Sequence, residues 1–135
     1  MATFSKFNAF VEAVAEKVHN LGSDQITVAL TNTAPTASNA VLADITEISY
    51  TNLSSRNITT TSSSQTSGTY KLVLADIVLT ATGAVGPFRY VVLYNSTAAS
   101  GNLIGYYDYG SSISLASGDT FTVDFDPSNG VLTIA

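Results

Sequence analysis

The sequence predicts a mainly β protein, a jelly-roll-like antiparallel β-sandwich of about eight strands with one N-terminal amphipathic α-helix. Two observations predict this class. Beyond the amino-terminal segment, short runs of Val, Ile, Leu, Tyr and Thr are separated by Gly, Asn, Ser and Pro. These runs recur about every eight to twelve residues, which is typical of sandwiches. The 135 residues suit one domain, with residues 1–22 forming the helix and residues 23–135 the sandwich.

The amino-terminal segment has the periodicity of an amphipathic helix. Its apolar residues recur at intervals of three and four, and Gly22 is a suitable stop signal. Burial of each large apolar side chain is worth about 1.5 to 3 kcal/mol, so this face needs a cover. Either a sheet of the same subunit or a neighbouring molecule provides it. The helix is predicted over residues 4–21, with His19 solvated or capping near its end, and its apolar face comprises Phe4, Phe7, Phe10, Val11, Val14, Val18 and Leu21.

From residue 24 the apolar period changes to two. Residues 25–31 alternate as a strand does, and Pro35 ends that run. Residues 41–50 mix apolar and acidic positions, which predicts a loop followed by a short strand. Residues 51–69 are almost wholly Ser, Thr, Asn and Gln, so a long exposed connection is expected there, with one edge strand near residues 57–61.

The second half of the chain has the stronger strand signals. Strands are predicted at residues 70–80, 88–94, 102–109, 112–115, 120–125 and 131–135. The last two runs are separated by Asp126-Pro-Ser-Asn-Gly130, in which Asp, Pro and Asn-Gly supply turn geometry. We therefore expect these two strands to form a hairpin.

The reactive side chains match no catalytic pattern, and the chain is not expected to be an enzyme. There is no Cys, and the single histidine, His19, accompanies no nucleophile motif. Asp124 and Asp126 share a strand face and resemble half of a glycosidase pair or a calcium loop, but Pro127 and the position of Gly130 do not fit the loop. We therefore predict no catalytic residue, no cofactor and no metal site.

The charge and hydropathy of the chain indicate which kinds of partner it can bind. The formal net charge is −5, and the five basic residues are scattered along the chain. Nucleic-acid binding is not expected, because phosphate neutralisation needs a basic patch. No stretch is apolar for long enough to predict a membrane-spanning helix. With only 11% charged residues, part of the surface is expected to be covered by a partner or by other copies.

An aromatic cluster near residue 107 has two interpretations. Tyr107 and Tyr109 are expected on one strand face and Tyr106 on the other, with Asp108 between them. Tyrosine rings beside a carboxylate suit stacking on sugars, whereas cross-strand packing of tyrosines explains the same residues structurally. The sequence is compatible with both interpretations.

Several stretches resemble a group of small virion structural proteins of tailed bacteriophages. In the first half these are residues 18–24 (VHNLGSD), 28–35 (VALTNTAP) and 42–48 (LADITEI). In the second half they are residues 103–110 (LIGYYDYG), 118–126 (GDTFTVDFD) and 129–134 (NGVLTI). Residues 51–68 are the least characteristic part of the resemblance.

The resemblance implies a capsid decoration or cement protein that binds the outer capsid surface and stabilises it by bridging capsid subunits. Its partners would be the major capsid protein and further copies of itself, as a homotrimer, in a virion assembled in the cytoplasm of the bacterial host. A neck, tail or baseplate protein is one alternative, and a carbohydrate-binding receptor module that uses the Tyr106–Tyr109 strand is another. The candidate interface residues are Phe4, Phe7, Phe10, Val14, Arg56, Asn57, Tyr107 and Tyr109.

Overall fold

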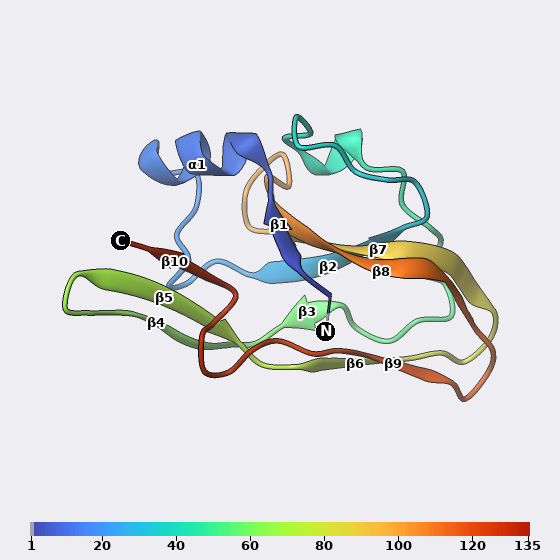
Figure 1. Cartoon of the computed structure of the whole chain (residues 1–135). Coiled ribbons are helices and arrows are strands. Elements are labelled where there is room, and N and C mark those ends of the chain that lie inside the picture. Colours follow the sequence, from blue (N-terminus) through green and yellow to red (C-terminus); the bar gives the residue numbers. More distant parts are fainter. Residues whose placement is uncertain (1) are drawn as a thin grey trace.

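The structure, a computed structural model, describes residues 2–135. Two layers of antiparallel strands face each other (Figure 1). The first layer is a five-stranded sheet of order β1-β8-β7-β2-β3, formed by β1 (Phe4–Lys6), β8 (Leu103–Leu115), β7 (Val85–Asn95), β2 (Ile26–Thr31) and β3 (Asn57–Ile58). The second layer combines β10-β5-β4 with β6-β9, formed by β10 (Leu132–Ile134), β5 (Thr69–Leu74), β4 (Thr60–Thr66), β6 (Ile77–Thr80) and β9 (Thr120–Val123).

The predicted fold class is confirmed. The described chain is mainly β, its strands pair antiparallel, and one short α-helix, α1 (Asn8–Ala15), lies near the amino terminus. A single-turn 3-10 helix, η1 (Leu42–Asp44), interrupts the loop after β2. The strand order is consistent with a jelly-roll-like sandwich.

The predicted helix over residues 4–21 is wrong at both ends. Phe4 lies in β1, which pairs with β8 in the register Phe4 to Tyr107. Phe7 keeps an extended backbone just before α1. The helix ends at Ala15, and Lys17 follows with a left-handed φ of 68°. The spacing of residues 4–6 suits a helix as well as a strand. These residues form a strand because their backbone pairs with the edge of β8.

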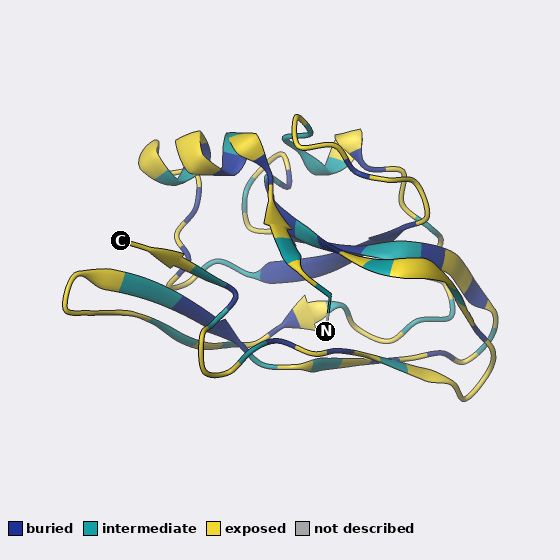
Figure 2. Cartoon of the chain, in the orientation of Figure 1, coloured by how far each residue is buried: buried dark blue, intermediate teal, exposed yellow. Residues whose placement is uncertain are grey.

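Apolar residues form two clusters, one on each face of the five-stranded sheet. The inner cluster lies between the two layers and includes Val28, Leu30 and Val91. The outer cluster lies on the opposite face, where Phe7 and Ile45 cover the sheet. Because both faces are covered, every residue of β2 is buried (Figure 2).

Residues 51–69 contain more strand than predicted. β3 and all of β4 lie in this range, although β4 has the sequence TTSSSQT. β4 is exposed along much of its length because it forms the edge of its sheet and pairs only with β5 among the described residues. Thr and Ser suit such an edge, since Thr favours extended backbone and both hydroxyls remain solvated.

The predicted carboxy-terminal hairpin is wrong. β9 pairs with β6, in the register Ile77 to Val123, whereas β10 pairs with β5. The turn at residues 126–130 therefore carries the chain from one strand pair to the other. The predicted strand at residues 70–80 is likewise divided into β5 and β6, and the runs at 102–109 and 112–115 join into the single strand β8.

Candidate functional site

An apolar groove of about 350 Å³ runs between α1, β1 and β10. α1 supplies one wall, and the edge strands of the two layers supply the other. We call it the α1–β10 groove; it is lined by Phe4, Lys6, Phe10, Val11, Val14, Ala15, Leu132, Thr133 and Ile134.

Large apolar side chains are exposed around this groove. Val11 is 55% exposed and Ile134 44%, and both line it. Val18 follows shortly after α1 and is 37% exposed. Figure 2 shows that the outward side of α1 is exposed. Among the described residues one other large apolar side chain is as exposed, Val78 on β6, so exposed apolar surface concentrates at the α1–β10 groove.

Two strand edges accompany the groove. In residues 2–135, β1 pairs only with β8 and β10 only with β5, so each strand keeps one edge without a strand partner. Unpaired backbone N–H and C=O groups can accept an added strand from another chain. The groove therefore combines apolar side chains with backbone groups able to pair.

The four candidate residues of the amino-terminal segment divide into two pairs. Phe7 and Phe10 are buried, Phe7 in the outer cluster and Phe10 in the inner one. These two side chains therefore pack against sheets of their own chain and not against a neighbouring molecule. Phe4 and Val14 are half-buried and line the α1–β10 groove.

Arg56 and Asn57 lie far from these residues in the sheet. They adjoin or belong to β3, which is at the opposite edge from β1. The Arg56 guanidinium stacks 3.6 Å from the centroid of the Tyr50 ring and donates a hydrogen bond to the carbonyl of Val28. Arg56 thus fastens the loop at residues 47–56 to β2, and the fold does not bring it together with Phe4 or Val14.

Tyr107 and Tyr109 both face the inner cluster, as strand alternation predicts, and Tyr106 faces the outer one. The Tyr107 ring lies between Phe4 and Phe125, with centroids 5.5 and 6.1 Å away. Burial raises the pKa of Tyr107. The buried Tyr107 ring is therefore not presented for stacking on a sugar, whereas the half-buried Tyr109 ring packs against Phe121, with ring centroids 5.1 Å apart.

The outward face of β7 and β8 carries a polar cluster that the sequence interpretation missed. Arg89 donates two hydrogen bonds to the Asp108 carboxylate, at 2.8 and 3.1 Å. These bonds lower the pKa of Asp108, and the backbone N–H of Gly110 lowers it further. Arg89 also lies over the Tyr90 ring, 5.3 Å from its centroid. Only the pairing of β7 with β8 brings these residues together.

His19 is buried, so its predicted solvated or capping position is wrong. It is 7% exposed and packs against Phe10, with ring centroids 5.2 Å apart. Asn95 Nδ2 lies 3.1 Å from His19 Nδ1 and donates a 2.7 Å hydrogen bond to Asp24 Oδ2. Burial lowers the pKa of His19, while the nearby Asp24 carboxylate opposes this shift. No local pattern indicates a partner 76 positions along the chain.

The orientation of the Asn95 amide fixes the His19 tautomer. Asn95 Oδ1 accepts hydrogen bonds from the backbone N–H groups of Thr97 and Ala98, so its Nδ2 faces His19 and Asp24. His19 Nδ1 is then an acceptor, and the neutral ring carries its proton on Nε2. That Nε2 group is buried and has no partner among the described residues.

The two carboxylates considered for metal binding do not form a common site. Asp126 caps its own turn by accepting hydrogen bonds from the backbone N–H groups of Ser128 and Asn129. These bonds and the Asn129 side chain lower the pKa of Asp126. Within residues 2–135 no group of His, Asp or Glu side chains has the arrangement of a metal site. No helix in that range is long and apolar enough to cross a membrane.

Comparisons of the chain with protein-family models, with curated proteins and with solved structures find no match.

Proposed function

We propose that this chain is a structural protein of a tailed-bacteriophage virion that decorates the outer capsid surface and stabilises the shell by bridging capsid subunits. Its partners are the major capsid protein and further copies of itself, arranged as a homotrimer. The sequence resemblance supports the virion assignment, and a surface suited to association supports the bridging role.

The α1–β10 groove is the observation that carries this proposal. It gathers Val11, Ile134 and the nearby Val18, all exposed, beside two strand edges without strand partners in residues 2–135. Exposed apolar surface of this kind marks contact sites in soluble proteins. The chain has only 11% charged residues, so few charges oppose close contact with a shell.

Bridging allows each contact to be weak. A protein that holds several subunits at once gains effective concentration for every contact after the first. The overall avidity can then exceed each single affinity by about 10² to 10⁴. A shell would be stabilised because opening it requires the simultaneous loss of several such contacts.

The copy number per particle tests this function. Quantitative mass spectrometry of purified virions compares this protein with the major capsid protein. We expect a fixed ratio that scales with the shell lattice. A small fixed number of copies would instead assign the protein to the neck, tail or baseplate, and its absence from virions would overturn the proposal.

Exposed valines provide a matched test of the contact surface. Val11→Asp changes the α1–β10 groove and Val18→Asp the exposed surface beside it, whereas Val78→Asp places the same charge on an exposed valine of β6. We expect the first two variants to co-sediment poorly with particles that lack the protein, and Val78→Asp to co-sediment like the wild type. Equal effects at all three positions would argue against the α1–β10 groove as the contact.

A further inference from the structure

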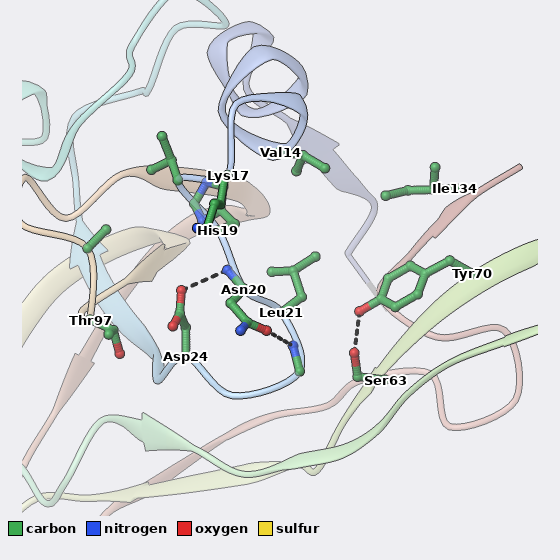
Figure 3. A pocket seen from close by; sticks show the side chains of 13 residues that line it. Val14, Lys17, His19, Asn20, Leu21, Asp24, Ser63, Tyr70, Thr97 and Ile134 are labelled. Atoms are coloured by element: carbon green, nitrogen blue, oxygen red, sulfur yellow. Dashed lines mark hydrogen bonds between the residues drawn. The ribbon is translucent and has the colours of Figure 1, made fainter.

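A second depression, of about 620 Å³, adjoins the α1–β10 groove. We call it the His19 cleft. One wall is apolar and includes Val14, Tyr70 and Ile134, while Asp24 and Thr97 lie on the opposite side (Figure 3). Its volume falls within the range of about 300 to 1,000 Å³ that is usual for small-molecule sites.

The polar side of the His19 cleft keeps unused hydrogen-bonding groups. Asp24 Oδ2 accepts from the Asn20 backbone N–H, at 2.8 Å, and from Asn95. Within residues 2–135, Asp24 Oδ1 has no hydrogen-bond partner, and neither does Asn20 Nδ2. Thr97 Oγ1 accepts from the Gln25 backbone N–H, which leaves its hydroxyl hydrogen available.

One further donor belongs to the His19 cleft. Lys17 lines it, and its ammonium group makes no hydrogen bond or ion pair within the described residues. His19 also lines it, but its Nε2–H group is buried and does not open onto the cleft.

These groups select a class of ligand. Lys17 and Asp24 line the same cleft, so an anion attracted by the ammonium group would be repelled by the carboxylate, and a cation would be repelled by the ammonium group. An uncharged ligand with many hydroxyl groups can accept from Lys17 and Asn20 while it donates to Asp24. Its apolar face would lie against the Tyr70 ring and Leu21, since aromatic side chains combine an apolar surface with a polar edge.

We propose that the His19 cleft is a carbohydrate-binding site for one or two uncharged sugar units. The site differs from the Tyr107 and Tyr109 rings considered from the sequence, which face the inner cluster. The inference does not depend on the virion assignment, because the cleft is formed by this chain alone.

Nuclear magnetic resonance titration of the whole chain tests the assignment. The probes are glucose, galactose, N-acetylglucosamine, maltose and cellobiose at millimolar concentration, with the zwitterion dialanine as a comparison that carries one charge of each sign. We expect at least one sugar to shift the backbone resonances of Asn20, Asp24 and Thr97. Larger shifts with dialanine than with every sugar, or no shift in the cleft, would overturn the proposal.

Two variants that each remove one positive charge localise the binding. Lys17→Gly removes the cleft ammonium at a residue whose φ of 68° suits glycine, so the fold is expected to persist. Arg89→Ala removes a charge from the outer face of β7. We expect Lys17→Gly to weaken sugar binding about fivefold, as loss of a solvated charged hydrogen bond would, and Arg89→Ala to bind like the wild type. The reverse pattern would place the sugar beside Tyr90 and refute the cleft.

Discussion

The close contact of β1 with β8 at Gly105 gives the sharpest test of the groove's construction. A Cβ atom at this position would lie 2.2 and 2.3 Å from two carbons of the Phe4 ring and 2.8 Å from the carbonyl oxygen of Ser5. Moving the ring alone does not clear the Ser5 backbone. Gly105→Ala should therefore displace β1 and with it one wall of the α1–β10 groove.

The expected cost of Gly105→Ala is about 2 to 3 kcal/mol of unfolding free energy. Overpacking alone costs about 1 to 3 kcal/mol, and displacement of β1 also exposes part of the Phe4 ring. Urea denaturation measures the loss, and hydrogen exchange at residues 4–6 reports whether β1 detaches. Gly22→Ala is the matched control, since its nearest neighbours would be 3.4 and 3.8 Å away. It should leave stability unchanged or raise it by about 0.4 to 1 kcal/mol.

A double-mutant cycle with Phe4→Ala separates the two contacts. Removal of the ring leaves only the Ser5 carbonyl oxygen close to the new Cβ. We expect Gly105→Ala to cost about 1 to 2 kcal/mol less in the Phe4→Ala background than in the wild type, because contacting residues are not additive. Additive costs, or a stable Gly105→Ala variant with protected β1 amides, would refute the reasoning.

Three further predictions concern single residues, each measured by urea denaturation. Because the pKa of His19 is lowered in the folded protein, the unfolded chain binds more protons than the folded one below about pH 6.5. The free energy of unfolding should therefore fall as the pH drops through this range. His19→Gln should make the free energy of unfolding depend less on pH. An unchanged slope would contradict this. Tyr50→Phe should cost about 1 to 3 kcal/mol, because the Tyr50 hydroxyl accepts from the buried Leu30 N–H at 2.9 Å; a cost near zero would show that this N–H finds another acceptor. Lys17→Gly should raise stability by about 0.5 to 1 kcal/mol by relieving the left-handed backbone, and a loss would contradict the φ of 68°.

The fold class was predictable because it depends on local pattern. Residues 88–94 are rich in strand-forming side chains and all lie in β7, and the predicted run 120–125 is a strand over residues 120–123. β2 shows where that pattern stops being informative. Its alternation predicts one solvated face, but Phe7 and Ile45 cover that face, so the whole strand is buried.

Partner choice was less predictable than local conformation. The turn at residues 126–130 was identified correctly as a turn, with Asp126 capping it and Gly130 at a φ of 77°. A turn constrains its own residues, whereas strand pairing depends on which edge is available. β10 pairs with β5 rather than with β9, and no residue of the turn encodes that preference.

The His19 cleft was not predictable for a related reason. Its polar groups come from residues 17–24 and 97, which the sequence separates widely. The sequence predicts only a solvated or capping role for His19, because its nearest chain neighbours offer no partner. Its environment depends on Asn95 at the end of β7, and only the pairing of β7 with β2 brings that amide close.

The length of α1 explains why apolar surface remains exposed at the α1–β10 groove. With 8 residues, α1 spans about 12 Å, whereas the 13 residues of β8 extend over about 43 Å. A helix over residues 4–21 would have covered more of this side. Because Phe4–Lys6 instead extends the sheet as β1, the helix that remains buries Phe10 but leaves Val11 exposed. The same pairing that removes Phe4 from the helix thus creates the strand edge and exposes the valines proposed to contact the shell.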